Sequence, residues 1–433
     1  MRKRVQGTEH EYTLYCRKMG TLGFDPHTLA LDLLRESDLH LAGEFIKNGS
    51  RAYYDVGHFE ISTCETSNPW DLVTWEKAGE KILDWLRKVM EEKYTAGGVK
   101  IHAFKNNTSP DGTSYGSHEN YCVSRDVAFP DRFVRELVPH LSTRFIYTGA
   151  GDIIDGKYVL SPMAYLTSSV VSGETMHDTG ILNTRDEPHA DARRWRRLHV
   201  IIGDALMNET AILLRHFATS MILELMEDRA LEDVPRMADP VRDMWHNVET
   251  RDPDEWEVHL DGGRTVSPIE IQRYYLGKIE PRAETEGERR AFKLLESTLD
   301  GLEKKSSKDL ARRVEWLDRY YAIQEETGGR EGPDVEMMAC KQYSEIGAER
   351  SLFYRRQRRG LIERVTTDDA ILRAIREPPA DTRAALRRTL CDRYNIESID
   401  WSLLVINDGT RRRIDMHDPY ATKLEERYAA AAS

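Results

Sequence analysis

The sequence predicts an α+β fold, with a large domain over residues 1–360 and a small C-terminal domain over residues 361–433. Strand-like segments lie mostly before residue 170, and helical segments dominate from about residue 205 to residue 360. The pair Pro378-Pro379 then indicates a break in regular structure, and a strand-like run follows at 401–406. A length of 433 residues suits two or three units at roughly 150 residues per domain.

Each element follows from a local pattern. Strands are expected where β-branched and aromatic residues gather, and helices where apolar residues recur every three or four positions. In order, the expected elements are a strand at 8–15, a helix at 24–36, strands at 51–56 and 58–63, a helix from Pro69 capped by Asn68, a strand at 100–105, a polar loop at 106–120, strands around 144–147 and 158–166, a helix at 205–228, charged helices to about 360 with a breaker at 328–333, and a strand at 401–406. The helix at 205–228 is dense in Leu, Ile, Met and Ala, so we expect it to be nearly buried.

Composition excludes several function classes. With 62 basic and 74 acidic side chains the formal net charge is −12, whereas proteins that coat nucleic acid normally carry a basic balance. No segment approaches the ~20 apolar residues of a membrane helix, and the amino terminus has no apolar stretch typical of a secretory signal. Five scattered cysteines without a CxxC pair indicate neither a disulfide framework nor a zinc ribbon. We therefore expect a cytoplasmic protein that binds neither nucleic acid nor membrane.

One stretch imitates a phosphate-binding loop. Residues 151–158 fit the pattern G-x-x-x-x-G-K, but Tyr158 stands where a magnesium-binding Ser or Thr belongs. Asp152 and Asp155 would also repel phosphate. Asp155-Gly156 between apolar runs is a common hairpin signal, so the stretch is predicted to be a β-hairpin.

Carboxylates on the expected strands form a more informative pattern. Glu9 and Glu11 lie two residues apart, so an extended backbone points both to one side of a sheet. The same period aligns Arg51, Tyr53 and Asp55 on a second strand, with Glu60 beyond the bend at Gly57. Like charges on one face repel, and Mg²⁺ held by carboxylates, water and nucleotide phosphates would compensate them. Solvated positions on a half-exposed sheet are the alternative, which the short E-x-E pattern alone favours.

Two further polar stretches could serve a phosphate-bearing ligand. Residues 105–107 and 114–121, which include His118, offer amide, imidazole, hydroxyl and backbone donors, although an ordinary turn would use the same residue types. Arg185 could stabilise charge on a transferring phosphoryl group. The arginines at 193, 194, 196 and 197 are interpreted as a solvated helix face, or as a basic stripe that docks an acidic partner.

Several longer stretches carry a resemblance to a known family. They are GTEHEY at 7–12, NGSRAYYD at 48–55, KNN at 105–107, SYGSHENY at 114–121, NTRDEPHAD at 183–191, RRLHVIIGD at 196–204 and RVTT at 364–367. In this order they resemble the family of Pup ligases and Pup deamidases (depupylases), from the first strand into the C-terminal domain. The resemblance thus extends over nearly the whole chain.

The resemblance implies a glutamine-synthetase-like fold of the carboxylate–amine ligase type. In such a fold a curved, mainly antiparallel sheet binds ATP and Mg²⁺, and a small C-terminal domain completes the nucleotide site. The matching positions imply that Glu9, Tyr53 and Glu60 bind the metal, that Arg51, Thr63 and Trp401 contact ATP, and that Asp55 is the catalytic base. His118 joins the expected nucleotide contacts because its polar stretch could hold phosphate oxygens, and Arg185 joins them because it could stabilise charge on the phosphoryl group.

The expected reaction joins the C-terminal glutamate of a disordered, Pup-like modifier to a lysine of a target protein. The alternative within the family is hydrolysis of the modifier's C-terminal glutamine amide or of the isopeptide bond. The five-residue step from Asp55 to Glu60 resembles deamidases, whereas the absence of a long insertion before the Asp55 strand resembles ligases. The ligase interpretation is preferred because the insertion is a whole structural element. A small-molecule glutamate–amine ligase and an inactive binding module are remoter alternatives.

Overall fold

Ten strands form the main sheet of the computed structural model, which describes residues 3–16, 25–55, 57–94, 98–109, 112–174, 178–328 and 332–423. Their order is β10-β11-β12-β7-β1-β5-β4-β3-β2, and β6 pairs with the C-terminal half of β1. β10 and β11 run parallel and the other pairs antiparallel. The strands are β1 (Gln6–Cys16), β2 (His40–Ala42), β3 (Phe45–Ile46), β4 (Arg51–Asp55), β5 (His58–Ser62), β6 (Ile101–Phe104), β7 (Ser117–Ser124), β10 (Ser169–Ser172), β11 (Gly180–Asn183) and β12 (Trp195–Val200).

Two long helices cover one face of this sheet. α3 (Pro69–Lys93) packs on β1 and β6, and α8 (Glu209–Glu227) packs on β7 and on α3. α3 begins where predicted, because the side chain of Asn68 accepts a hydrogen bond from the N–H of Asp71 and Pro69 takes the first helical position. Apart from its last residue, α8 is buried along its whole length, as its apolar composition predicts. We call the face under these helices the back face, and the opposite one the front face.

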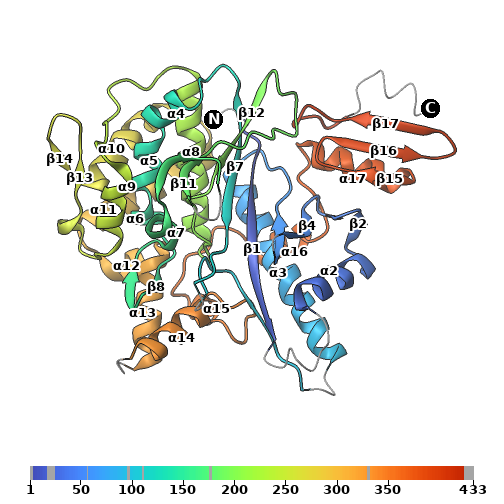
Figure 1. The fold of residues 1–433 in the computed structure, drawn as a ribbon, viewed down its shortest axis with the longest axis horizontal. Coiled ribbons are helices and arrows are strands. Elements are labelled where there is room, and N and C mark those ends of the chain that lie inside the picture. Colours follow the sequence, from blue (N-terminus) through green and yellow to red (C-terminus); the bar gives the residue numbers. More distant parts are fainter. Residues whose placement is uncertain are drawn as a thin grey trace.

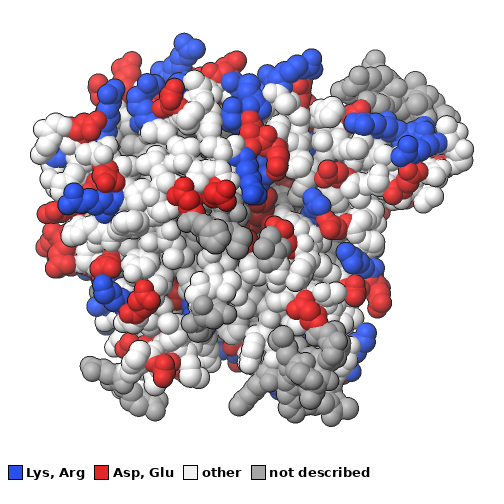
Figure 2. All heavy atoms as spheres, viewed as in Figure 1, with Lys and Arg blue, Asp and Glu red and all other residues white. Residues whose placement is uncertain are grey.

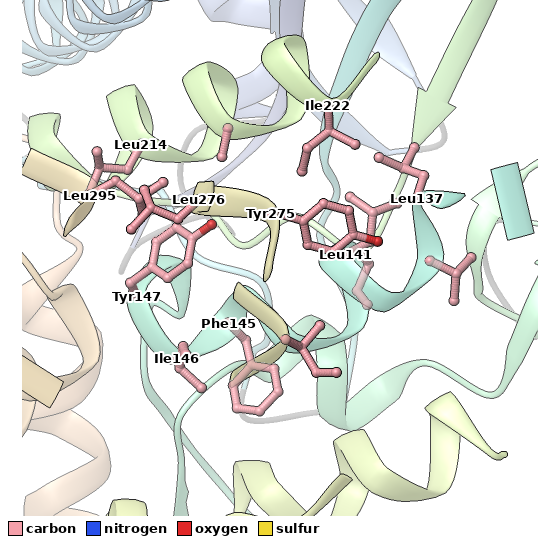
Figure 3. Close-up of a cluster of buried hydrophobic side chains, with 14 of the residues drawn as sticks. Leu137, Leu141, Phe145, Ile146, Tyr147, Leu214, Ile222, Tyr275, Leu276 and Leu295 are labelled. Carbon is pink, nitrogen blue, oxygen red and sulfur yellow. The ribbon is translucent and has the colours of Figure 1, made fainter. Parts of the chain in front are cut away.

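Most of the remaining helices gather beside the sheet around a large apolar core (Figure 1). Figure 3 shows Leu141, Tyr147, Leu214, Tyr275 and Leu295, from five different helices, converging in this core. These helices are α4 (Asp131–Glu136), α5 (Val138–Thr143), α6 (Phe145–Thr148), α7 (Pro162–Leu166), α9 (Pro240–Val248), α10 (Pro268–Ile279), α11 (Glu286–Glu303), α12 (Ser307–Ala311) and α13 (Glu315–Thr327). Helices α14 (Pro333–Tyr343) and α15 (Leu352–Arg358) contribute instead to a second apolar cluster, together with α3. Helix α2 (Pro26–Glu36) instead packs near β4 and β5, and short hairpins β8 (Asp152–Ile154) with β9 (Lys157–Val159) and β13 (Val258–His259) with β14 (Thr265–Val266) complete this part.

The C-terminal part has a three-stranded sheet of its own, drawn in red at one end of the molecule (Figure 1). The strands β15 (Ile396–Ile399), β16 (Leu403–Asn407) and β17 (Arg411–Asp415) pack with α17 (Arg383–Arg393) around a small apolar cluster. Helix α16 (Asp368–Ala374) packs instead on α3 of the large part. The fold class is therefore α+β as predicted, while the domain boundary at residue 360 stays a prediction.

The hairpin prediction for residues 151–158 is confirmed. Strands β8 and β9 pair antiparallel, and Asp155 (φ 51°) and Gly156 (φ 76°) form the turn with left-handed backbone. Both positive φ values suit a two-residue hairpin turn, in which Asp and Gly are favoured. The phosphate-loop interpretation is thereby excluded.

Two predicted strands are wrong. Residues 145–148 form α6, which continues the helical path of α5, because Arg144 is drawn inward to pair with the buried Glu119. The predicted strand at 158–166 ends at Val159. Ser161 then caps α7 and Pro162 takes its first position, so a helix start signal outweighs the β-forming residues around it.

Other predicted elements agree with the structure within a few residues, except for the helix face expected at residues 193–197. The predictions outside the described residues concern position 56 at the end of the predicted strand at 51–56, residue 24, and positions 329–331 of the predicted breaker. Among the helices of the described ranges, none combines the length and apolar character that a membrane span needs. Acidic and basic side chains are interspersed over the face shown in Figure 2, and several Lys and Arg side chains line its upper edge.

Candidate functional site

Strand pairing places the predicted site residues on the front face of the sheet. Glu9 of β1 is in register with Ser62 of β5 and with His118 of β7. Glu60 of β5 is in register with Glu11 of β1 and Tyr53 of β4. Partners in register share a face, so the two-residue period of four neighbouring strands builds one polar surface. This surface lines a cavity of about 340 Å³.

Glu9 lies at the centre of a cluster of nitrogen donors. Its carboxylate is 2.9 Å from Arg197 Nη2, 3.6 Å from His199 Nε2 and 3.7 Å from His118 Nδ1. Burial alone would raise the pKa of Glu9, but Arg197, His118 and His199 outweigh it and hold that pKa below its usual range. Glu9 is therefore ionised and can act as a ligand for a cation.

Glu60 is in the opposite electrostatic state. It is 4% exposed, and burial together with the nearby charge of Glu9 raises its pKa well above the usual range. The hydroxyl of Tyr53 donates a short hydrogen bond to Glu60 and lies 3.1 Å from Ser62 Oγ. Burial and the neighbouring glutamates also raise the pKa of Tyr53. The carboxyl group of Glu60 thus has a hydrogen-bond donor but no cationic side chain within ion-pair distance among the described residues.

The residues of this face fit a divalent cation. Glu9, His118 and His199 present ligand atoms that all lie within 4.8 Å of one another. Both ring nitrogens of His199 are buried and have no hydrogen-bond partner in the described residues. A bound cation would give the His199 imidazole a partner and would reduce the repulsion between the neighbouring carboxylates. Mg²⁺ prefers oxygen ligands, which Glu9 and Glu60 supply.

Asp55 lies at the open end of the cavity. It ends β4, is exposed, and faces His58 across the hairpin that joins β4 to β5. His58 is held by Glu11, whose carboxylate is 2.8 Å from its Nδ1. Asp55 makes no side-chain hydrogen bond or ion pair to any other described residue, so its carboxylate is free to accept a proton.

The predicted nucleotide contacts line this cavity or the pocket beside it. Arg51, Arg185 and Trp401 border the same cavity as Glu9, and Arg51 binds Glu44 at 2.8 Å. Thr63 lines the adjoining pocket of about 110 Å³, which Trp401 also borders. The Thr63 hydroxyl accepts a hydrogen bond of 2.9 Å from the N–H of Thr8. Thus every predicted site residue lies along one continuous depression, while the role of each stays a prediction.

The sequence interpretation missed two residues of this site and misassigned their element. Arg197 and His199 lie on β12, so the predicted helix at 193–197 is wrong. The two side chains follow the same two-residue period as Glu9 and Glu11, and this alternation was the signal that could have found them. Four arginines in five residues concealed it, because such a charge run is typical of a solvated helix face.

Comparisons with known proteins agree with this site. The model of the family described as "Pup-ligase protein" matches residues 5–405. The Pup–protein ligase of Acidimicrobium ferrooxidans is 35% identical over 447 residues, which cover 98% of this chain and 97% of the relative. The Pup–protein ligase of Kribbella flavida is 34% identical and covers 97% of each chain.

Two solved structures share the fold. The ligase PafA in complex with the prokaryotic ubiquitin-like protein Pup superposes with a TM-score of 0.88 at 28% identity, covering 100% of this chain and 93% of that one. PafA in complex with ADP gives a TM-score of 0.81 at 29% identity, covering 95% and 94%. With the family match over most of its length and relatives above 30% identity, the chain belongs to the Pup ligase family.

Proposed function

We propose that the protein is an ATP-dependent ligase that attaches a Pup-like modifier to lysines of target proteins. The observation that carries this proposal is the front face of the sheet, where Glu9, Glu60 and Tyr53 meet beside the free carboxylate of Asp55. The chain also matches PafA, the ligase of Pup, over its whole length. The matched relatives are ligases by name, so the deamidase alternative is not favoured.

The chemistry requires ATP because a carboxylate does not condense with an amine in water. The side-chain carboxylate of the modifier's last glutamate attacks the γ-phosphorus of ATP, which forms a glutamyl phosphate and releases ADP. The target lysine then attacks the acyl carbon, the C–O bond to phosphate breaks, and inorganic phosphate leaves. A lysine of pKa ~10.4 arrives protonated and must lose protons to form the neutral amide.

The chain's own residues suit these steps. Asp55 would take a proton from the lysine at the open end of the cavity. Arg185, exposed at the cavity wall, would stabilise negative charge on the transferring phosphoryl group. Glu9, Tyr53 and Glu60 would hold Mg²⁺, whose charge, when bound, neutralises the phosphates of ATP.

The nucleotide would lie between the large part of the chain and the C-terminal part. Arg51 comes from β4, Thr63 directly follows β5, His118 comes from β7, and Trp401 lies in the turn between β15 and β16. The proposed compartment is the cytoplasm, in keeping with five free cysteines, which are typical of a reducing environment. The proposed partners are the modifier and lysine-bearing proteins.

The test incubates the protein with Mg²⁺, a lysine-bearing target and a Pup-like peptide that ends in Glu or in Gln. With ATP and the Glu-ending peptide, mass spectrometry should find the peptide joined to a target lysine with loss of one water. The same mixture without ATP is the control and should yield no conjugate. Deamidation of the Gln-ending peptide without conjugation of the Glu-ending one would contradict the proposal in favour of the hydrolase.

A further inference from the structure

A buried carboxylate behind the nucleotide pocket has no role in the proposed chemistry. Glu65 follows β5, two residues after Thr63, and is 7% exposed. It borders the pocket that Thr63 and Trp401 also line. A carboxylate at this place would repel phosphate unless cations compensated it.

Two arginines of α17 compensate Glu65. Arg383 Nε lies 2.7 Å from Oε1, and Arg387 binds both carboxylate oxygens at 3.0 and 2.7 Å. All three side chains are buried. Burial alone would raise the pKa of Glu65, but Arg387 and Arg383 outweigh it and lower that pKa to about 2. Glu65 is therefore ionised and fixes both guanidinium groups.

Arg387 connects Glu65 to Trp401. It donates to the backbone carbonyl of Trp401 at 3.0 Å, and its guanidinium carbon lies 5.3 Å from the centre of the indole ring. The same guanidinium lies 4.7 Å from the ring of Phe45, which meets Trp401 edge-on at 5.1 Å. The indole is thus held by Arg387, whose guanidinium Glu65 fixes, and by the ring of Phe45.

Further walls of the site depend on the same group. Arg387 also donates to the carbonyl of Gly49, two residues before Arg51, at 3.3 Å. Arg383 donates to the carbonyls of His189, in the loop that carries Arg185, and of Met416, the latter at 2.9 Å. Through these two arginines, Glu65 is therefore connected to three parts of the site: the segment before β4, the loop of Arg185 and the end of the C-terminal sheet.

We propose that Glu65 is a positioning residue that holds Trp401 and the C-terminal part against the nucleotide pocket through Arg383 and Arg387. This inference rests on the proposed function for the identity of the ligand, a nucleoside diphosphate or triphosphate. Removing the charge leaves two buried arginines without a carboxylate, so they turn toward other partners and release the carbonyl of Trp401. The nucleotide then meets a wall that is no longer preorganised.

The test compares Glu65→Gln with the unchanged protein. Calorimetry should find ADP binding weakened by roughly tenfold or more, since small displacements of positioning groups have effects of this size. Asp318→Asn is the matched control, because Asp318 is also buried and binds an arginine, Arg356, at 2.7 and 2.9 Å outside the pocket. The control should leave ADP affinity within a factor of about two. Equal losses in both variants would overturn the inference, because they would reflect general destabilisation.

A double-mutant cycle separates positioning from a merely structural effect. If Glu65 acts through Trp401, Glu65→Gln should weaken ADP binding much less in a Trp401→Ala background than in the unchanged protein. Equal losses in both backgrounds would overturn the inference. If Glu65→Gln does not fold, Glu65→Asp can replace it, because this change keeps the charge but shortens the side chain by one methylene. The same double-mutant cycle is then measured with Glu65→Asp.

Hydrogen exchange without nucleotide keeps this inference distinct from the proposed function. Loss of Glu65 should speed exchange of backbone amides around residue 401, whatever the ligand, while the Asp318→Asn control should leave them unchanged. Unchanged exchange around residue 401 in Glu65→Gln would overturn the inference. If exchange rises but the unchanged protein does not bind ADP, the positioning role stands and the proposed function fails.

Discussion

Two buried carboxylates on opposite faces of the central strands, Glu119 and Glu60, are in opposite electrostatic states. On the back face, Glu119 of β7 is fully buried and binds Arg144, which lowers the pKa of Glu119 to about 2 against the effect of burial. On the front face, Glu60 is almost as buried, but it has only the Tyr53 hydroxyl as donor and its pKa is raised. Burial is similar in the two cases, so the difference lies in the pairing.

The back face extends this pairing into a network. Glu76 of α3 binds Lys105 at 2.7 Å and His10 at 3.1 Å, and Lys105 also binds Glu80 at 2.9 Å. Each of these carboxylates has a cation within the protein, so none remains for a ligand. On the front face Glu9 binds Arg197, but Glu60 and Asp55 have no cationic partner among the described residues. Such unpaired carboxylates distinguish a site for an external cation from ion pairs that serve the fold.

The largest expected effect concerns Asp55 on the front face. Asp55→Asn keeps the shape of the side chain but cannot take a proton from lysine, so conjugation should fall by roughly 10²–10⁴-fold or more. Because Asp55 has no partner among the described residues, the thermal midpoint and ADP affinity should stay the same. A conjugation assay, a thermal melt and calorimetry check the three expectations. Wild-type rates in Asp55→Asn would remove the residue from its proposed role.

The second prediction compares how much the fold is destabilised when a paired carboxylate of the back face or an unpaired one of the front face is removed. Glu119→Gln should destabilise the fold by about 3–5 kcal/mol, because it leaves Arg144 buried without its carboxylate. Glu60→Gln, measured without Mg²⁺, should change stability little or raise it, since Glu60 faces Glu9 and has no cationic partner among the described residues. Urea unfolding of both variants gives the comparison. Equal destabilisation by the two substitutions would break the distinction between the faces.

Much of the front face could be predicted because side chains of a strand alternate between two faces, so residues two positions apart in the sequence share a face. Glu9, Tyr53, Asp55 and Glu60 were found by spacing alone, and pairing in register then made them neighbours. Trp401 could not be found this way, because its place beside β4 depends on how α17 packs against Glu65. The resemblance to the family supplied that residue and Thr63.

The errors arose where a distant contact outweighed a local pattern. Residues 145–147 have the aromatic and β-branched character of a strand, yet the neighbouring Arg144 reaches Glu119 from a helix. Arg197 belongs to a run that suggests a solvated helix, yet pairing of β12 with β7 brings it to Glu9. Neither partner is visible in the local sequence, since both contacts join residues far apart in the chain.

The smallest expected effect separates burial from pairing by pH. Asp204 is buried and accepts backbone hydrogen bonds from Ala150 and Met163, at 2.9 and 3.0 Å. Arg215 donates to the backbone carbonyl of Asp204 at 2.6 Å and not to its carboxylate. Burial therefore dominates and raises the pKa of Asp204 from 3.8 to about 6. The pKa of Glu119 is instead lowered, although Glu119 is also buried and also lies close to Arg215, at 3.9 Å.

The sign of the effect on stability follows from proton binding. Between about pH 4 and pH 6 the folded protein keeps the proton on Asp204, whereas the unfolded chain loses it, so this group lowers stability as pH rises. The loss is at most roughly 3 kcal/mol and is complete above pH 6. Asp204→Asn removes it, so the stability of the variant relative to the unchanged protein should rise across this range. Urea unfolding at pH 4.5 and 6.5 measures the change, and parallel values for the two proteins would mean that Asp204 is already ionised in the fold.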